Sequence, residues 1–485
     1  MINIDLVALL LFIAEVLIAL AAAIYVSANR KPSSAIAWVL AVIFIPVIGI
    51  LFFLLVGTGR LPKHRRDKQL FVSSTIQEKT QGGLAKLSGR EQWPDWLPSI
   101  ARLNWNLGAL PMVGGNTAEL CDDYISSIEA MIADIDQASD YVHVEFFILV
   151  YDDTTAPFFD ALARACRRGV TVRVLSDHIA QYSYPNRKKT LEVLQEMGAQ
   201  YQPMLPLQPL KGHWRRPDLR NHRKLVVIDG RIAHTGSLNM IVDNYHKKAN
   251  VQKGLHWHEL MARFRGPVVR ALDAVFVTDW YSETKDLLPL NYQPVVLSEE
   301  PGQLDSQVVP SGPSFENDNN LKLFAAVIQN ARRRISVTSP YYVPDETIQM
   351  ALVTAGSRGL DVELFVSEIS DQFMVFHAQR SYYEQLLRAG VKIYLYRAPT
   401  VLHAKHLSID DDVAIIGSSN MDIRSLSLHM ELMVMVHGVD FVTALRAVED
   451  DYRSKSRQVI LDEWLKRPRT EKAFDNLMRM TSALM

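Results

Sequence analysis

The chain contains one arrangement of reactive residues twice. Each copy has a histidine, a lysine two residues later, an aspartate and then Gly-Ser-x-Asn, with the same spacing throughout. The first copy consists of His222, Lys224, Asp229, Ser237 and Asn239, and the second of His403, Lys405, Asp410, Ser418 and Asn420. An imidazole can attack phosphorus or carry a proton, while ammonium, hydroxyl and amide groups bind phosphoryl oxygens. The two copies therefore predict a phosphodiester site with one nucleophile and one proton carrier.

Each copy begins a pair of strands, which should bring its polar side chains together. In the first copy the apolar run 225–228 follows the lysine and turns at Asp229 into a second strand. Side chains two residues apart in a strand share a face, so His222 and Lys224 should project together while Arg223 points away. The serine and the asparagine of each copy share a face for the same reason. The aspartates belong to the motif but lie at tight turns, where Asp commonly bonds the local backbone, so we expect a structural role for them.

A nucleophilic imidazole needs a partner that holds its other ring N–H and fixes the tautomer. Glu259 opens a strand that follows the first copy, and Glu431 opens a strand that follows the second. We predict that these two glutamates are the carboxylates that orient the histidines.

The segments around the two copies also repeat. Residues 162–175 align with residues 352–365 as a helix that ends at Arg-Gly, followed by an alternating strand. The order strand, helix, strand, helix, strand predicts an α/β fold with two pseudo-symmetric sandwich domains, each a mostly parallel or mixed sheet flanked by helices. The predicted parts are a transmembrane hairpin (1–60), a basic linker and connecting segment (61–110), a first domain (111–290), a linker (291–318) and a second domain (319–485).

Two apolar runs near the N-terminus, Leu6 to Val26 and Ser34 to Val56, predict the two spans of this hairpin. A cleavable signal peptide is the alternative for the first run. Basic residues crowd the exit of the second run, and such residues remain on the cytoplasmic side of a membrane. The catalytic domains are therefore expected to face the cytoplasm. The basic residues are Arg60, Lys63, Arg65, Arg66 and Lys68.

The overall charge argues against a nucleic-acid partner. The formal net charge is −1, whereas nucleic-acid-binding domains are usually strongly basic. We expect neither a metal nor a cofactor, because no Cys/His spacing or carboxylate cluster resembles a metal site. Three arginines before the first copy, Arg215, Arg216 and Arg220, are candidates for binding an anionic lipid headgroup, with a solvated basic loop as the alternative. The C-terminal stretch 473–485 predicts either a helix packed on the second domain or a helix at a membrane surface.

The duplicated motif resembles that of the phospholipase D superfamily, and nearly the whole chain is similar to bacterial cardiolipin synthases. The similarity departs at His429, where the family usually has asparagine. The segments that carry it besides the motif are residues 46–49, 310–313, 339–344, 420–426 and 464–468.

This resemblance implies a multi-pass enzyme of the bacterial plasma membrane that joins two phosphatidylglycerols into cardiolipin and glycerol. A phosphatidyl-histidine would form on His222, with His403 as the acid and base and without a nucleotide or metal. Two other reactions stay open from sequence. A hydrolytic phospholipase D would use water as acceptor, and a membrane-tethered phosphodiesterase or nuclease would act on nucleic-acid backbones.

Overall fold

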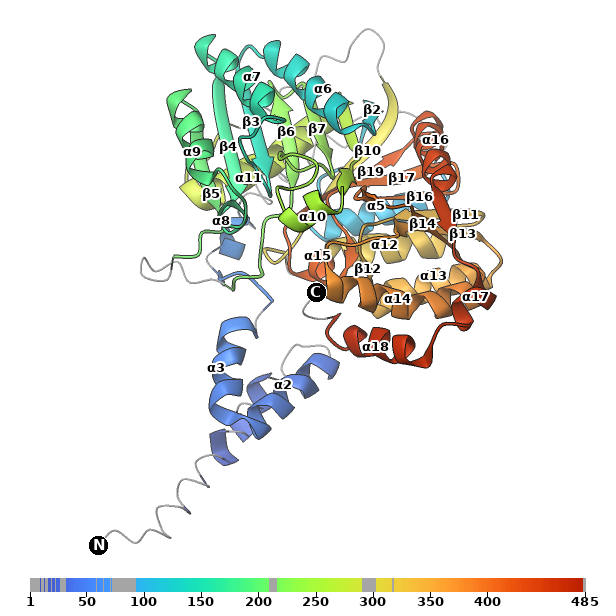
Figure 1. The fold of residues 1–485 in the computed structure, drawn as a ribbon. Helices are drawn as coiled ribbons and strands as arrows, with labels where there is room; N and C mark the ends of the chain where they lie inside the picture. The colour runs from blue at the N-terminus through green and yellow to red at the C-terminus, as the bar shows by residue number, and fades with distance from the viewer. Residues whose placement is uncertain are drawn as a thin grey trace, which may run out of the picture. The chain divides into compact units, whose positions relative to one another are not determined.

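The computed structural model of the chain describes residues 93–208, 216–289, 302–315 and 318–482, together with residues 32–57, 59–63, 65–69, 71 and scattered positions before residue 27. The chain divides into two compact units. One comprises residues 1–61 and 207–219, and the other comprises residues 62–206 and 220–485. The duplicated motif lies entirely in the second unit (Figure 1).

The second apolar run forms two short helices, α2 (Pro32–Phe44) and α3 (Pro46–Val56), and not one continuous helix. Pro46 lacks the N–H needed to continue α2, so the helix breaks there. The two helices pack on each other: the Trp38 and Phe53 rings lie 5.3 Å apart, and a Cβ on Gly49 would meet the Ala41 carbonyl oxygen at 2.4 Å. Among the described residues, no helix reaches the length and hydropathy required to cross a bilayer. The first apolar run lies largely outside the described residues.

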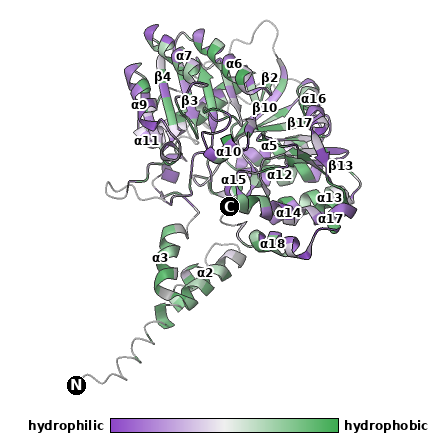
Figure 2. Cartoon of the chain, viewed as in Figure 1, coloured by the Kyte–Doolittle hydropathy of each residue, from purple (hydrophilic) through white to green (hydrophobic). Residues whose placement is uncertain are grey.

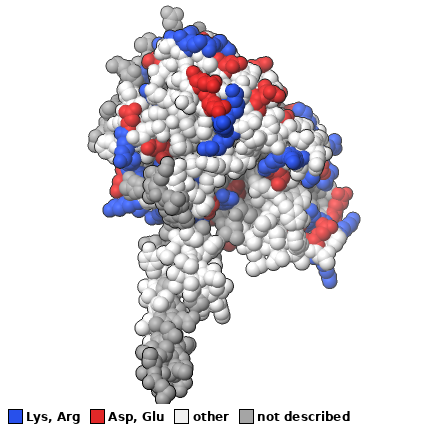
Figure 3. Space-filling view, turned by 60° about the vertical axis from the view of Figure 1, so that its left-hand side comes forward, with Lys and Arg blue, Asp and Glu red and all other residues white. Residues whose placement is uncertain are grey.

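Residues 32–59 carry no charged side chain, which is visible in the hydropathy colouring of Figure 2 and in the white surface of Figure 3.

The first lobe of the second unit is a seven-stranded mixed sheet. The order is β2 (Thr117–Cys121), β9 (Met261–Arg265), β7 (Ile232–Gly236), β6 (Lys224–Ile228), β3 (Tyr141–Phe146), β4 (Thr171–Asp177) and β5 (Gln200–Met204). Only the β3–β4 and β4–β5 pairs are parallel, so the sheet is mixed and not mostly parallel. Helices α6 (Tyr124–Asp136), α7 (Ala156–Arg167) and α9 (Arg187–Glu196) contribute to the core on one face, and α11 (Val268–Thr284) packs on the other.

The second lobe repeats this arrangement in a nine-stranded sheet. The order is β1 (Val113–Gly115), β10 (Gly302–Ser311), β19 (Glu431–His437), β17 (Val413–Gly417), β16 (His406–Ile409), β11 (Arg334–Thr338), β13 (Asp361–Ser367), β14 (Lys392–Tyr396) and β20 (Ser456–Gln458). Strands β19 to β14 occupy the positions that β9 to β5 occupy in the first lobe. Helices α12 (Asn319–Asn330), α13 (Glu346–Ser357) and α14 (Phe373–Arg388) share its main core, and α16 (Val439–Ser454) follows β19.

The structure differs from the predicted domain boundaries around the linker and the connecting segment. Residues 302–311, predicted as part of a linker, form strand β10 against β19. Gln307 of this strand accepts a hydrogen bond from Asn104 at 2.9 Å, on helix α5 (Leu97–Asn106). Helix α5 and strand β1, predicted as connecting segment and first domain, both pack on the second lobe. The side chains that looked suited to a solvated linker are therefore satisfied inside the structure.

The remaining elements are short. They are α8 (Ala180–Ser183), α10 (Lys248–Gln252), β8 (His256–His258), β12 (Tyr342–Val343), β15 (Thr400–Leu402), β18 (Met421–Asp422), α15 (Ile423–Ser427), α17 (Leu461–Leu465) and α18 (Arg469–Arg479).

Candidate active site

Two short parallel seams join the lobes beside the histidines. Strand β15 pairs with β8, and the His403 backbone N–H donates to the His258 carbonyl at 2.7 Å. An isolated bridge joins Asn221 to Met430, and the His222 backbone N–H donates to the Met430 carbonyl at 2.8 Å. Each histidine therefore enters the site next to the residue that precedes the other lobe's glutamate.

The histidine–glutamate pairs are consequently crossed between the lobes. The His222 Nδ1 lies 2.9 Å and 3.1 Å from the Glu431 carboxylate oxygens. The His403 Nδ1 lies 2.8 Å from both Glu259 oxygens. Both predicted carboxylates contact a histidine, but neither contacts the one that precedes it in its own lobe. In each pair Nδ1 is engaged, which leaves Nε2 for a reacting atom.

The two lysines lie beside their histidines, as strand parity predicts. The Lys224 Nζ donates to the His222 carbonyl at 2.5 Å, and the Lys405 Nζ donates to the His403 carbonyl at 2.5 Å. Burial lowers the pKa of Lys224 to about 7 and that of Lys405 to about 8. A bound phosphate would favour the charged ammonium in both cases.

The two imidazoles differ in their affinity for a proton. Burial, and then the charges of Lys224 and His429, lower the pKa of His222 well below its usual range. Burial also lowers the pKa of His403, to about 4, but the Glu259 charge opposes that shift. Burial thus favours the neutral ring at both positions, and the Glu259 carboxylate makes His403 the better placed of the two to hold a proton.

The two glutamates differ as well. Burial raises the pKa of Glu431 to about 8. Burial also acts on Glu259, but the His403 charge and hydrogen bond outweigh it and leave the pKa of Glu259 below its usual value. A tyrosine that the sequence analysis missed, Tyr245, donates to the Glu259 carboxylate at 3.2 Å and accepts from the Asn239 amide at 2.9 Å. Nothing in the second copy corresponds to it, because Leu426 stands six residues after Asn420.

The hydroxyl groups of the two serines were predicted to bind phosphate. In the structure they instead bond to residues at the start of the strands that follow each copy. The Ser237 hydroxyl accepts from the Leu260 N–H at 2.9 Å and donates to the Leu260 carbonyl at 3.2 Å. The Ser418 hydroxyl accepts from the Leu432 N–H at 2.9 Å and donates to the Glu431 carboxylate. A hydroxyl has one proton to donate. Ser237 donates it to the residue that follows Glu259, and Ser418 donates it to Glu431 itself.

Asn239 and Asn420 keep unused hydrogen-bonding capacity, since their amide oxygens are buried without a partner.

The motif aspartates lie at turns, where their carboxylates bond the backbone and not the histidines, so they have the structural role expected for them and not a catalytic one. Asp229 accepts the N–H groups of residues 139–141, at 2.8–2.9 Å. Asp410 accepts the N–H groups of residues 332–334. Burial would raise the pKa of Asp229, but these backbone hydrogen bonds keep it below its usual value. Each aspartate thus fixes the start of a neighbouring central strand.

The two described arginines before the first copy are each paired with a carboxylate. Arg220 is buried and bonded to Asp177 at 3.3 Å, in the interior of the first lobe. Arg216 forms a two-bond ion pair with Asp218, at 2.6 Å for each bond. Arg215 lies outside the described residues. Local carboxylates, which the sequence did not associate with these arginines, occupy the two that are described.

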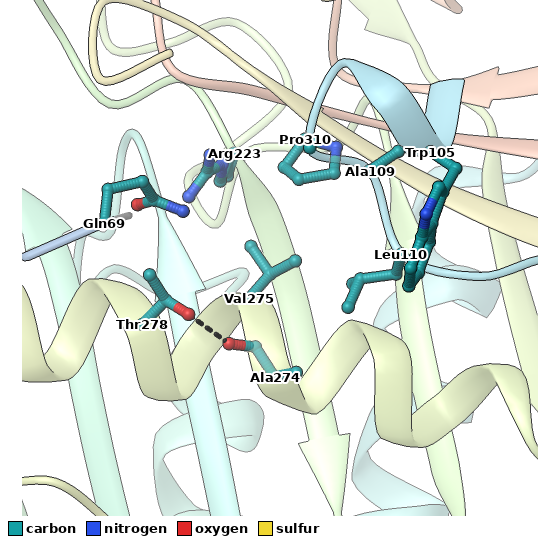
Figure 4. Close-up of a pocket in the computed structure, with 10 residues that line it drawn as sticks. Gln69, Trp105, Ala109, Leu110, Arg223, Ala274, Val275, Thr278 and Pro310 are labelled. Atoms are coloured by element: carbon teal, nitrogen blue, oxygen red, sulfur yellow. Dashed lines mark hydrogen bonds between the residues drawn. The ribbon is translucent and has the colours of Figure 1, made fainter. Parts of the chain in front are cut away.

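Arg223 points away from the histidines, as parity predicts, but it has a role that the sequence analysis missed. Its guanidinium is buried, pairs with Asp279 and donates through Nε to the Glu431 carbonyl at 3.1 Å. Figure 4 shows it beside a cavity of about 20 Å³, with Trp105 and Leu110 at the far end. This cavity lies on the opposite face of the strand from His222. Arg223 therefore fixes the strand that carries Glu431, while the second copy has Ala404 in its place.

His429 lies beside His222, with ring centroids 5.5 Å apart, and both its ring nitrogens are buried without a hydrogen-bond partner. Its Nδ1 is 3.9 Å from the Glu431 carboxylate. One ligand atom from each of His222, His429 and Glu431 lies within 4.8 Å of the others, which makes this the one candidate metal-ligand cluster in the described part of the chain. In the first lobe Trp257 occupies the position that His429 occupies in the second, two residues before the glutamate. Trp257 packs on Tyr245.

Comparisons with known proteins agree with this geometry. A family model described as the PLD-like domain of cardiolipin synthase matches residues 131–277 and 324–450, and a phospholipase D-nuclease N-terminal model matches residues 16–57. The chain is 30% identical to cardiolipin synthase A of Proteus mirabilis and 31% identical to that of Shigella boydii, in each case over 94% of both chains. The fold is similar to that of a phosphatidylserine synthase from Haemophilus influenzae, with a TM-score of 0.57 and 13% identity over 79% of this chain and 97% of that one. The chain belongs to the cardiolipin synthase family of phospholipase D-like enzymes.

Proposed function

We propose that this protein is a phosphatidyltransferase that makes cardiolipin and glycerol from two molecules of phosphatidylglycerol. The observation that carries the proposal is the crossed pairing of His222 with Glu431 and of His403 with Glu259. Each carboxylate holds Nδ1 and directs Nε2 toward a shared site. Membership of the cardiolipin synthase family supports phosphatidylglycerol as the substrate.

The reaction proceeds in two displacements at one phosphorus. The His222 Nε2 attacks the phosphorus of the first lipid and the bond to the headgroup glycerol breaks. His403 enters this step protonated at Nε2, with the Glu259 carboxylate stabilising the imidazolium, and gives that proton to the departing oxygen. His403 then removes the proton from the terminal hydroxyl of the second lipid. That oxygen attacks phosphorus, the phosphorus–nitrogen bond breaks and His222 is restored. One phosphodiester replaces another, so the exchange consumes no nucleotide.

The proton affinities of the two imidazoles support this division of roles. His222 has cationic neighbours, which favour a neutral and therefore nucleophilic ring. His403 is paired with a glutamate whose ionised form is favoured, and that charge stabilises an imidazolium during proton transfer.

Lysine and asparagine side chains would bind the non-bridging oxygens of the phosphoryl group. Lys224 and Lys405 supply charge inside a buried site, where an ammonium interacts more strongly than it does in water. Asn239 and Asn420 supply amide N–H groups from the segments that follow β7 and β17. The two lysines would thus balance the negative charge that spreads over the phosphoryl oxygens in the transition state.

The N-terminal unit would anchor the enzyme in the bacterial plasma membrane, with the catalytic lobes facing the cytoplasm. The two apolar runs, the uncharged stretch 32–59 and the basic residues that follow support this topology. A cysteine-accessibility scan of residues 28–34 and 60–70 in spheroplasts would test it. Labelling of residues 28–34 from the periplasmic side, with residues 60–70 protected, would agree with a hairpin, and labelling of both segments from the same side would contradict it.

Purified full-length protein given phosphatidylglycerol alone tests the reaction. Equal amounts of cardiolipin and glycerol are expected, with no product from the His222→Ala variant. Phosphatidic acid as the main product would instead indicate a hydrolase and would overturn the synthase assignment. Expression in a host that lacks cardiolipin, followed by lipid mass spectrometry, gives the same answer in a membrane.

A further inference from the structure

Helix α18 packs on α14 (Figure 1), and charged side chains of both helices take part in this contact. Asp475 is 1% exposed. It accepts from His377 and from Arg467, each at 2.8 Å. Arg380 of α14 also bonds Glu471 of α18, at 3.0 Å. An ion-pair network therefore holds the helix in place.

Helix α18 and the residue after it also expose large apolar side chains. Phe474 is 37% exposed, Leu477 54% and Met480 80%. Two residues at the start of α14, Phe373 and Met374, continue this surface with 66% and 43% exposed, and the Phe373 and Phe474 rings lie 5.9 Å apart. We refer to these five residues as the C-terminal apolar patch. A contiguous exposed patch of this kind marks an interaction surface.

The charges around the patch are mostly basic. Residues 466–480 contain five basic side chains and two acidic ones, and both acidic groups are already bonded, Glu471 to Arg380 and Asp475 to Arg467. Basic side chains beside an apolar surface fit a bilayer that contains anionic lipids.

A short chain of contacts links the patch to the catalytic site. Asp371, two residues before Phe373, accepts from the Tyr341 hydroxyl at 2.8 Å. The Tyr341 ring lies 6.4 Å from the His403 ring. Asp371 also accepts from Lys247 of the first lobe at 2.8 Å, so this edge of the site involves both lobes. The patch is thus connected through Asp371 and Tyr341 to the surroundings of His403.

We infer that the C-terminal apolar patch is a docking surface for the anionic lipid bilayer, which brings the site to its lipid substrate. This inference rests on the proposed function for the identity of the substrate, but the docking itself is a separate property of α14 and α18. Phe474, Leu477 and Met480 enter the interfacial region while the basic residues of α18 lie at headgroup level.

The test uses the full chain in phosphatidylglycerol-containing proteoliposomes, with Cys121 and Cys166 replaced by alanine. A bimane probe on Leu477→Cys should be quenched by lipids that carry bromine on the acyl chain near the headgroup. A probe on Ile125→Cys, a residue of α6 in the first lobe that is 50% exposed, should not be quenched. Equal quenching at both positions, or none at position 477, would overturn the inference.

A turnover measurement separates docking from catalysis. The triple variant Phe474→Ser, Leu477→Ser, Met480→Ser should lose about tenfold in activity on vesicles, because the apolar area that enters the membrane is lost. It should keep wild-type activity on monomeric short-chain phosphatidylglycerol, and Ile125→Ser should be unchanged on both. Lipid-independent cross-linking between Leu477→Cys chains would assign the patch to a second copy and overturn the inference. If the wild-type chain makes no cardiolipin while the probe is quenched, the proposed function fails and the docking surface stands.

Discussion

The two lobes carry the same motif but place their histidines in different surroundings. His222 lies near Phe147 and His429, and burial raises the pKa of its partner Glu431 to about 8. His403 lies near Tyr245 and Tyr341, and its partner Glu259 is ionised more easily than a free glutamate. Motif residues contribute to these pKa shifts in both lobes, but the aromatic neighbours of the two histidines lie outside the motif and differ between the lobes. A duplicated motif therefore supplies two imidazoles, and its surroundings give each one a different task.

The largest effect should come from removing each histidine in turn. His403→Asn leaves the proposed nucleophile intact but removes the proton carrier, so turnover should fall by up to about 10⁴-fold. An acid-labile, alkali-stable phosphatidyl adduct should then accumulate on His222, detectable by mass spectrometry of peptides. His222→Asn should be equally inactive and form no adduct. An adduct on His403 in that variant would reverse the roles of the two lobes.

The crossed glutamates give the next largest effect. Glu259→Gln and Glu431→Gln should each lower turnover by about 10²-fold, because the carboxylate bonded to Nδ1 holds the orientation and tautomer of the histidine ring. Because the pairs are crossed, Glu259→Gln should accumulate an adduct on His222, as His403→Asn does. Glu431→Gln should form little adduct. The opposite pattern would show that each glutamate serves the histidine of its own lobe.

The convergence of the motif could be predicted from sequence, because it depends on strand parity within a few residues. His222 and Lys224 share a face, and Arg223 does not, for that reason alone. The crossing could not be predicted, because it depends on pairing between residues far apart in the chain, such as Leu402 with His258. The roles of the serines were mistaken for a related reason: their partners are backbone groups of strands that only the folded sheet brings near.

The predictions for the linker and for Arg220 differ from the structure for another physical reason. Composition described residues 302–311 correctly as rich in polar and turn-forming residues, but Gln307 and Asp305 find partners inside the fold. Arg220 was judged by its charge, whereas a buried carboxylate, Asp177, neutralises it. In each case the missing information was a tertiary partner.

The pH dependence of kcat/KM should report the asymmetry between the lobes. Below pH 8 Glu431 takes up a proton and no longer fixes the N–H tautomer of His222, so the rate should fall as the pH is lowered. Above pH 7 to 8 Lys224 and Lys405 lose their protons in the free enzyme, so binding of the anionic lipid should weaken as the pH is raised. Each limb should approach about tenfold per pH unit, giving a narrow maximum between pH 7 and 8. Initial rates at subsaturating phosphatidylglycerol from pH 5.5 to 9.5 would check this, and a flat profile from pH 6 to 9 would contradict it.

The smallest effect on activity, and an equal one in the two lobes, should come from the motif aspartates. Asp229 and Asp410 both adopt positive φ, 51° and 49°, which asparagine tolerates better than most residues. Asp229→Asn and Asp410→Asn should therefore keep the turn but weaken the hydrogen bonds to three backbone N–H groups, lowering the free energy of unfolding by roughly 1–3 kcal/mol. Turnover of the folded variants should stay near wild type, because neither carboxylate contacts a histidine. Chemical denaturation together with kcat measured well below the melting temperature would separate the two effects. A large loss of kcat in the stable fraction would place these carboxylates in the chemistry after all, and a loss in only one lobe would extend the asymmetry from the site to the scaffold.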